Sequence, residues 1–353
     1  MIMKINDKIV EFATLGGSLL GGGGGGSMKE GKQIGKMAVK IGNPAVIDIE
    51  DLPDDATIIT VSAVGAPAAR EQYIEPMDYV KAIEILKRNG VRIDGIITCE
   101  NGGFATVNGW FQSAVLNIPV VDAPCDGRAH PMGIMGSMGL HKIEEYVSKQ
   151  AAVGGEKGRH LEIYTSGNLD RVSRIIRQAA VFSGGMVAVA RNPAGVDYVR
   201  KSAAVGAITQ AIELGRTMKE ASDGMIEKAL RCMGGEKIGE GIVKKVKVET
   251  TEGFDVGIAS VKAMDETYEL TFWNEYMCIE KSGQRMGTFP DLIATVNLET
   301  GLPLTTAEIK KGQKVAILRI PKENLKLGLG LKDSELFREV EKITGKEIIK
   351  YVR

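Results

Sequence analysis

The 353-residue sequence has few cysteines, few aromatic residues and no net charge. Its four cysteines are far apart and form no C-x-x-C pair, which argues against a disulfide framework or a structural zinc site. Lys plus Arg and Asp plus Glu number 45 each, so there is no basic excess of the kind that binds nucleic acids or anionic membranes. We therefore expect no nucleic-acid partner and no membrane partner.

The sequence also lacks a long apolar run. No stretch approaches the ~20 apolar residues of a membrane-spanning helix. Asp7 and Glu11 interrupt the apolar residues near the N-terminus, which is not typical of a signal peptide. Together with the unpaired cysteines, this predicts a cytoplasmic protein. With 44% hydrophobic residues the chain can bury a large core, and its length predicts two units.

Glycine is the residue in excess, with 44 copies, or about 12% against a usual ~7%. Six of them run unbroken over Gly21–Gly26, between a helix predicted at residues 6–20 and one that Ser27 and Glu30 begin as a capping box. A nucleotide-binding loop would need a preceding strand or a following Lys-Ser/Thr pair, and neither is present. We favour a loop that brings backbone amides close to a small ligand; a flexible linker and structural packing are the alternatives.

Short β-branched runs alternate with helical stretches over the first half of the chain. The runs ATIITVSAVG and VRIDGIITCE predict buried strands, and residues 77–90 predict a helix that ends at a glycine. This alternation predicts an α/β domain with a largely parallel sheet over residues 1–167. For the C-terminal region, 168–353, we expect helices packed on that domain (168–235), a β-rich barrel or sandwich (about 236–322) and a terminal helix (about 333–346).

Two polar stretches directly follow predicted strands, which is where parallel α/β sheets bind their ligands. The first is CENGGFATVNG, residues 99–109, and the second is VVDAPCDGRAHP, residues 120–131. We expect their polar side chains to converge on one opening. These candidates are Glu100, Asn101, Asp122, Asp126, Arg128 and His130.

Each candidate also has a structural interpretation. Arg128 can hold one of the two aspartates in an ion pair that orders the loop, and His130 can be a loop histidine with satisfied hydrogen bonds. A cysteine alone in a loop, such as Cys125, is usually unreactive. Asp122, Asp126 and His130 can also bind a divalent metal ion, although zinc and iron sites usually show tighter spacing.

The order of several motifs resembles the S-methyl thiohydantoin desulfurase family over nearly the whole chain. These motifs are LGGSLLGGGGGG, ENGGFATVNG, IPVVDAPCDGRAHP, FWNEY, FPDLIATVNLETGLPLTT and KKGQKVAIL. Members are often encoded beside hydantoinase and oxoprolinase genes. The resemblance implies an N-terminal α/β domain and a C-terminal region with a β-rich module. It also implies hydrolysis of a small S-methylated thiohydantoin to a hydantoin and methanethiol.

For that reaction we expect Glu100 or Asp122 as the general base and His130 or Asp126 as the proton donor. Backbone amides of the glycine run and of the paired glycines would hold negative charge on the ring. Arg128 would bind a carboxylate arm of the substrate or order the acids. The expected substrate-binding residues are Gly22, Gly23, Gly24, Asn101, Gly102, Gly103, Gly127 and Arg128. We expect no cofactor.

The sequence departs from the family pattern D-x-D-G-M-G-R-A-x-P-E. Pro124 replaces the second acid, Met132 replaces the last one, and Phe104 stands where an asparagine usually follows the paired glycines. His130 is an addition to the pattern. These departures leave two other functions open: a non-catalytic binding or regulatory subunit of a hydantoinase-type enzyme, and a metal-dependent cyclic amidohydrolase. We also expect a homo-oligomer, and association with a hydantoinase- or oxoprolinase-type protein.

Overall fold

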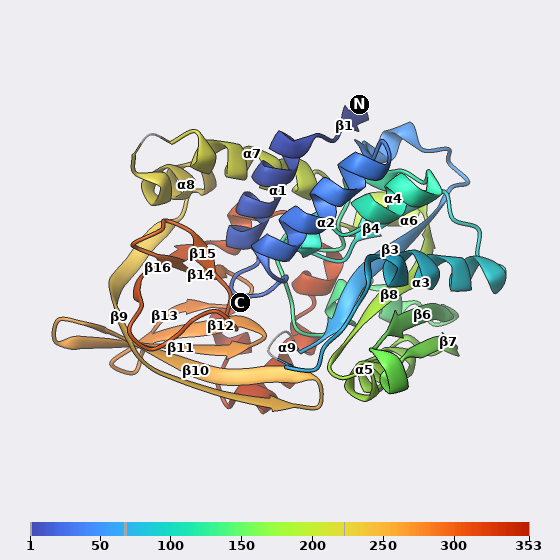
Figure 1. The fold of residues 1–353 in the computed structure, drawn as a ribbon. Helices are drawn as coiled ribbons and strands as arrows, with labels where there is room; N and C mark the ends of the chain where they lie inside the picture. Colours follow the sequence, from blue (N-terminus) through green and yellow to red (C-terminus); the bar gives the residue numbers. More distant parts are fainter. Residues whose placement is uncertain (1, 67–68, 222, 353) are drawn as a thin grey trace.

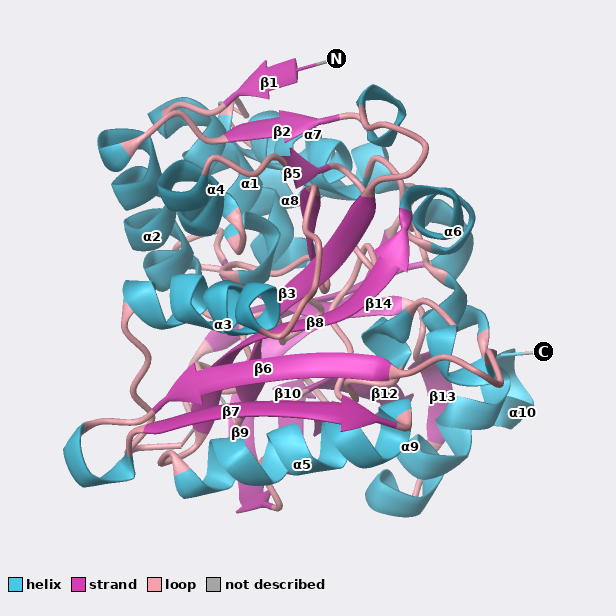
Figure 2. Cartoon of the chain, turned by 90° about the vertical axis from the view of Figure 1, so that its right-hand side faces the viewer, coloured by secondary structure: helices cyan, strands magenta, loops and turns pink. Residues whose placement is uncertain are grey.

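The computed structural model describes residues 2–66, 69–221 and 223–352, and Figures 1 and 2 show the ribbon from two sides. Two eight-stranded sheets organise the chain. The strands of the first sheet are β1 (Ile2–Lys4), β2 (Ala45–Ile47), β3 (Thr57–Gly65), β4 (Gly95–Thr98), β5 (Val120–Val121), β6 (Ser148–Gly154), β7 (Leu161–Gly167) and β8 (Met186–Gly195). The α-helices are α1 (Asp7–Leu20), α2 (Met28–Ile41), α3 (Pro76–Arg88), α4 (Trp110–Leu116), α5 (Leu169–Phe182), α6 (Val196–Ser202), α7 (Ala207–Lys219), α8 (Met225–Met233), α9 (Phe337–Thr344) and α10 (Ile349–Val352).

The first sheet has a parallel core and antiparallel flanks. Its order is β1-β2-β5-β4-β3-β8-β6-β7. The four strands from β2 to β3 run parallel, whereas β1 on one side and β8, β6 and β7 on the other pair antiparallel. The predicted α/β fold is confirmed. Because β8 follows residue 167, both predicted domains contribute to this sheet, and the domain boundaries themselves stay predictions.

Helices cover both faces of this sheet. Consecutive strand residues point to opposite faces, so Ile58 packs in a cluster with Val199 of α6, while Ile59 packs in another with Ile83 and Leu86 of α3. In Figure 2 α3 lies in front of β3, and α5 runs along β7. The parallel core is therefore buried on both sides, which explains its continuous apolar runs.

The second sheet curls around its own apolar core. Its strands are β9 (Glu236–Thr251), β10 (Phe254–Ala263), β11 (Glu266–Trp273), β12 (Glu275–Lys281), β13 (Gln284–Thr288), β14 (Leu292–Asn297), β15 (Pro303–Leu304) and β16 (Lys314–Ile320). The order is β13-β12-β11-β10-β9-β16-β14-β15, and every pair is antiparallel. β12 also contacts β14, which is not its ladder neighbour, and one cluster holds Phe272, Ile279 and Ile317. The predicted β-rich module is confirmed.

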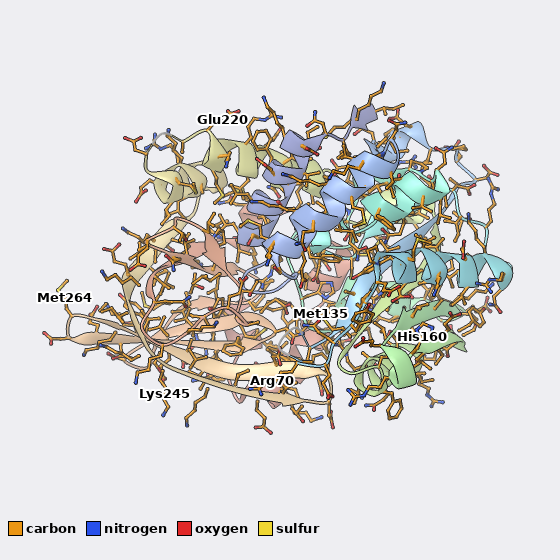
Figure 3. The ribbon with its side chains drawn as sticks, viewed as in Figure 1. Arg70, Met135, His160, Glu220, Lys245 and Met264 are labelled. Carbon is orange, nitrogen blue, oxygen red and sulfur yellow. The ribbon has the colours of Figure 1, made fainter. Side chains whose placement is uncertain are left out.

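The two units pack against each other through a buried interface. Figure 1 shows the second sheet, in orange, to the lower left of the first, and Figure 3 shows side chains filling the space between them. Met135, which follows the strands of the parallel core, lies in one fully buried cluster with Trp273 and Met277 of the second unit. Met264, at the far turn of the second sheet, points outward and is 94% exposed.

Arg128 stabilises this interface. Its fully buried guanidinium donates hydrogen bonds to the carbonyl oxygens of Ala129 (3.0 Å), Pro290 (3.2 Å) and Asp291. The guanidinium carbon lies 4.6 Å from the centre of the Phe289 ring, a cation–π contact. Burial lowers the pKa of Arg128 to about 10, so the group stays charged at neutral pH.

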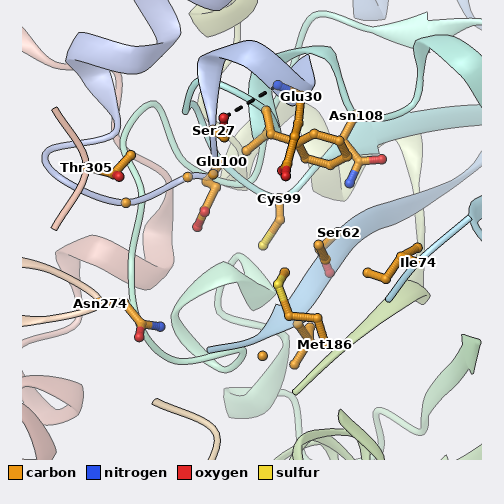
Figure 4. Close-up of a pocket in the computed structure, with 18 of the residues that line it drawn as sticks. Ser27, Glu30, Ser62, Ile74, Cys99, Glu100, Asn108, Met186, Asn274 and Thr305 are labelled. Carbon is orange, nitrogen blue, oxygen red and sulfur yellow. Dashed lines mark hydrogen bonds between the residues drawn. The ribbon is translucent and has the colours of Figure 1, made fainter. Parts of the chain in front are cut away.

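The first two helices begin where the sequence predicts. The Asn6 side chain accepts a hydrogen bond from the amide of Ile9 (3.0 Å) and caps α1. The Ser27 hydroxyl accepts one from the amide of Glu30 (3.5 Å) and caps α2. Only this half of the predicted capping box is present, because the Glu30 carboxylate points into the central cavity instead (Figure 4). No helix among the described residues is long and apolar enough to cross a lipid bilayer.

Glycines let α1 and α7 approach closely. A β-carbon on Gly16 would lie 1.9 Å from the carbonyl oxygen of Ala211, and one on Gly215 would lie 1.8 Å from that of Phe12. Since backbone atoms cannot move aside as a flexible side chain can, the helices would have to separate. This contact fixes the end of α1, where the glycine run begins.

We expect Gly16→Ala to lower the free energy of unfolding by about 3 kcal/mol, at the upper end of the usual cost of overpacking. The matched control is Gly158→Ala, because a β-carbon there would meet nothing within 4 Å. Urea denaturation followed by circular dichroism measures both variants. Equal stability of the two would contradict the close helix contact.

Candidate active site

A cavity of about 630 Å³ lies between the two units, and both units line it. Residues 23–27 of the glycine loop form one wall, and the ends of β3 and β4 form another. Asn274 and Glu275, at the start of β12, close it from the second unit. Figure 4 shows Cys99 and Asn274 pointing into this space from opposite sides. The cavity thus lies at the carboxyl ends of the parallel strands, as predicted for a ligand site.

The glycine run is an ordered loop, so the linker interpretation is wrong. Its carbonyl oxygens accept hydrogen bonds from amides outside the run: Gly22 from Tyr276 (2.9 Å), Gly23 from Thr306 (2.8 Å), and Gly25 from Phe104 (3.0 Å) and Ala105 (2.9 Å). Four of its glycines adopt the left-handed conformation that other residues disfavour. They are Gly22, Gly23, Gly25 and Gly26, with φ of 56°, 93°, 70° and 78°.

Close packing and free amides coexist in this loop. A β-carbon on Gly24 would lie 2.0 Å from a carboxylate oxygen of Glu275, and one on Gly25 would lie 2.4 Å from the α-carbon of Gly102. Structural packing therefore requires glycine at both positions. The amides of Gly23, Gly25 and Gly26, which line the cavity, have no hydrogen-bond acceptor in the described part of the chain. Ligand binding by these amides stays a prediction.

The Cys99 thiol lies on the cavity wall with two basic groups against it. β4 sets its position, because the Cys99 amide donates to the carbonyl of Val61 (3.1 Å) beyond the strand end. Arg191 of β8 donates from Nη2 to Sγ at 3.0 Å, and Nε2 of His130 lies 3.5 Å from the same sulfur. Cationic neighbours of this kind favour the thiolate, the form of cysteine that acts as a nucleophile.

The electrostatics of the cluster support a thiolate–imidazolium pair. A hydrogen bond from the Cys125 thiol holds the pKa of Cys99 well below its usual range, and the two cations beside the sulfur add to this effect against burial. Burial alone would lower the pKa of His130, but the negative sulfur and the nearby carboxylates raise it to about 10. Burial raises the pKa of Cys125 well above its usual range, so that thiol stays neutral.

Two carboxyl groups surround His130. Glu100 Oε2 accepts a hydrogen bond from the His130 amide (3.2 Å) and lies 3.5 Å from Nε2. Asp126 Oδ2 also lies 3.5 Å from Nε2, while its Oδ1 accepts a hydrogen bond from the amide of Gly328 (3.0 Å). Burial, acting with the charge of Cys99 and against the effect of His130, raises the pKa of Glu100 to about 7. Glu100 can therefore both give and take a proton near neutral pH.

The structure brings some of the predicted site residues together and separates others. Gly23, Gly24, Glu100 and His130 line the cavity, and Asp126 contacts His130 behind them.

Asp122 lies elsewhere, which corrects its predicted role as general base. Its carboxylate accepts hydrogen bonds from the amides of Ile208 (2.7 Å) and Thr209 (3.1 Å). These amides are in the first turn of α7, so Asp122 fixes a helix start.

Most of the predicted binding residues are structural. Gly22, Asn101, Gly102, Gly103, Gly127 and Arg128 are not among the residues that line the cavity. Asn101 donates to the carbonyl of Ala207 (2.9 Å), and the Gly127 amide donates to that of Lys326 (2.8 Å). Gly102 and Gly103 allow their loop to lie against the glycine loop and the start of α2. Arg128 holds the carbonyls of the second unit rather than a substrate arm or an aspartate.

Two polar residues of the cavity that contact each other, Cys99 and Arg191, were not singled out by the sequence analysis. The position of Cys99 directly after a buried strand was a usable signal, since neighbouring Glu100 was chosen on that ground. Arg191 had no local signal, because β8 reaches the site only by pairing with β3, far away in sequence. Phe104 and Met132, two of the departures from the family pattern, also line the cavity.

The same cluster can hold a metal ion. Donor atoms of Cys99, Glu100 and His130 all lie within 4.8 Å of one another, and sulfur, nitrogen and oxygen donors suit Zn²⁺. The guanidinium of Arg191 against the sulfur argues for an ion-free thiolate, because a bound cation would repel this second positive charge. No other group of this kind is found in the described ranges.

Two family models match the sequence. The S-Me-THD-like N-terminal domain matches residues 8–163, and the S-Me-THD-like C-terminal domain matches residues 167–326. A crystal structure of a protein from Chromobacterium violaceum shares the fold over 96% of this chain and 97% of its own, with a TM-score of 0.76 and 19% sequence identity. No curated protein matches the sequence.

We expect Cys99 to be the cysteine that iodoacetamide alkylates fastest at pH 6, because its lowered pKa leaves more of it as thiolate than an ordinary cysteine. Exposed Cys232 serves as the internal control in the same samples. Peptide mapping by mass spectrometry at pH 6 and pH 8.5 measures both rates. A Cys99 rate with the pH dependence of the Cys232 rate would contradict the thiolate.

Proposed function

This chain belongs to the S-Me-THD-like family, whose two domain models match most of its length, and we propose that it hydrolyses an S-methylated thiohydantoin to a hydantoin and methanethiol. The observation that carries the proposal is the Cys99 sulfur held between Arg191 and His130 on the wall of a cavity with room for a small ring. The carbon that bears the methylthio group is bonded to two nitrogens and one sulfur, and such a carbon accepts a thiolate nucleophile.

The first half of the reaction transfers the ring to Cys99. The thiolate attacks the methylthio carbon, and the electrons of the carbon–nitrogen double bond move to the ring nitrogen, which takes a proton from Glu100. The tetrahedral intermediate then collapses: the carbon–nitrogen double bond re-forms, its proton returns to Glu100, and the bond to the methylthio group breaks. Methanethiolate leaves with the proton of the His130 imidazolium.

The second half releases the ring. Neutral His130 takes a proton from a water molecule, and the hydroxide attacks the carbon now bonded to Cys99. The carbon–sulfur bond breaks and Cys99 leaves as a thiolate, while the second water proton moves to the ring nitrogen. The products are the hydantoin and methanethiol, and one water is consumed. Asp126 steadies the imidazolium, and free amides of the glycine loop are positioned to stabilise negative charge on the ring.

A metal-dependent cyclic amidohydrolase is the second candidate, and the donor atoms of Cys99, Glu100 and His130 favour it. In that case the ion would be held by these three side chains and would lower the pKa of a bound water. The non-catalytic subunit is the third candidate. A cytoplasmic location, a homo-oligomer and association with a hydantoinase- or oxoprolinase-type protein accompany the proposal as predictions.

We expect Cys99→Ser to reduce methanethiol release from an S-methyl thiohydantoin by roughly 10³-fold or more, the loss seen when a nucleophile is removed. His130→Asn should reduce methanethiol release as well. It should also leave a mass adduct on Cys99, because His130 no longer activates the water that hydrolyses the ring bonded to Cys99. Gas chromatography measures methanethiol, and intact-protein mass spectrometry measures the adduct. Cys232→Ser, an exposed cysteine, is the control. Turnover by Cys99→Ser at the wild-type rate would refute the proposed nucleophile, and no turnover by folded wild-type protein would favour the binding subunit.

We further expect dialysis against a chelator to leave methanethiol release unchanged, because the thiolate mechanism needs no ion. Metal content by plasma mass spectrometry and activity would be followed on the same samples. If the chelator removed one equivalent of zinc together with the activity, and added zinc restored the activity, the result would instead support the metal-dependent amidohydrolase.

A further inference from the structure

A buried glutamate of the second unit faces the cavity with one carboxylate oxygen that has no partner in the described part of the chain. Glu275 opens β12, lines the cavity and is 3% exposed. Its Oε2 is buried and has no hydrogen-bond partner among the residues that the structure describes. Leaving a buried polar atom without a hydrogen-bond partner is unfavourable, and a ligand that supplied the missing hydrogen bond would remove this cost.

The backbone holds Glu275 in this place from both sides. The residue before it, Asn274, donates its amide to the carbonyl of Asp255 (2.7 Å) and accepts the Asp255 amide at Oδ1 (2.9 Å). The residue after it, Tyr276, donates its amide to the carbonyl of Gly22 (2.9 Å). The carboxyl group lies against Gly24, in the space where a β-carbon would be. It is a fixed group, not a mobile surface acid.

No cation neutralises this carboxyl group. Within the described residues, no lysine, arginine or histidine nitrogen lies within 4.0 Å of it. The charged groups that act on it are Glu100, His130 and Arg128. Arg128 donates hydrogen bonds to backbone carbonyls through Nε and Nη1, and its Nη2 has no partner among the described residues. Burial first, and then the negative charge of Glu100, raise the pKa of Glu275 to about 8. A buried carboxyl without a partner cation is therefore mostly protonated at pH 7.

A protonated carboxyl presents a hydrogen-bond donor and an acceptor side by side. The edge of a hydantoin-type ring where an N–H adjoins a ring carbonyl presents an acceptor and a donor in the complementary order. We propose that Glu275, as a neutral acid, binds this N–H/carbonyl edge with two parallel hydrogen bonds and so selects rings that are unsubstituted at that nitrogen. This inference rests on the proposed function, because the ring that Glu275 binds is the ring of the proposed substrate.

The proposed contact also orients the substrate. The methylthio carbon is the other ring neighbour of the bound nitrogen, so it lies beside the edge that Glu275 holds. Glu275 belongs to the second unit and Cys99 to the first, and both line the same cavity. Glu275 is accordingly a specificity residue, whereas the bonds that form and break are at Cys99.

Isothermal titration calorimetry with hydantoin and its methyl derivative at the imide nitrogen tests the proposal. We expect wild-type protein to bind hydantoin at least tenfold more tightly than the methylated ring at pH 7. Glu275→Gln should bind hydantoin within about threefold of wild type, because an amide also offers a donor and an acceptor side by side. Glu275→Ala should bind at least tenfold more weakly.

The pH dependence separates a neutral acid from a merely polar side chain. With a pKa of about 8, about a tenth of the Glu275 side chains are neutral at pH 9. The affinity of wild type relative to Glu275→Gln should therefore fall about tenfold between pH 7 and pH 9, and this ratio cancels any ionisation of the ligand. Glu269→Gln, on the exposed side of neighbouring β11, should keep the wild-type pH dependence.

Equal binding of both rings by wild type, or loss of binding in Glu275→Gln as large as in Glu275→Ala with unchanged circular dichroism, would overturn the neutral-acid contact. So would the absence of hydantoin binding by wild type. These outcomes are distinguishable from failure of the proposed function, which is decided by methanethiol release from wild type and Cys99→Ser. An enzyme that turns over through Cys99 but accepts methylated rings equally would refute Glu275 recognition alone.

Discussion

The close approach of bare backbones at the centre of the molecule is the constraint on which the rest depends. The loop after α1 touches the loop after β4 at Gly25 and Gly102, and it touches the carboxyl group of Glu275 at Gly24. A β-carbon on Gly25 or Gly102 would push these two loops apart, and one on Gly24 would clash with the Glu275 side chain. These three segments form part of the cavity wall, so their close approach sets the position of that wall. Six consecutive glycines are the local sequence that such a meeting point requires.

The chemistry of the cavity depends on charges brought in from separate elements. Cys99 directly follows β4, His130 lies in the loop after β5, and Arg191 belongs to β8. Burying charges is costly unless they are paired, and here the thiolate, the imidazolium and the guanidinium compensate one another within 3.5 Å. Glu275 differs from this cluster, because no cationic nitrogen of the described residues lies within 4.0 Å of its carboxyl group. The cavity thus has an ionic wall on the first unit and a neutral polar one on the second.

Local sequence was sufficient for the elements and for part of the site. The cap of α1 and the buried strands follow from short-range rules, and strand ends correctly indicated Glu100 and His130 as cavity residues. Asp122 and Arg128 were indicated by the same rule but point elsewhere, because the first turn of α7 and the carbonyls around Pro290 compete for them. Those partners are 86 and 162 residues away in sequence. Only the complete fold shows that these polar side chains are already hydrogen-bonded to groups far away in sequence.

The division of the cavity between the two units has a consequence for inheritance. Cys99 and Glu275 are encoded about 175 residues apart, and Glu275 is positioned through the hydrogen bond from the Tyr276 amide to the carbonyl of Gly22 in the first unit. Recombination that exchanged one half for that of a distant relative would have to preserve the glycine contacts, the Arg128 site and the spacing across the cavity all at once. We therefore expect the two halves to be inherited together, and substrate specificity to change through the residues that line the cavity between them.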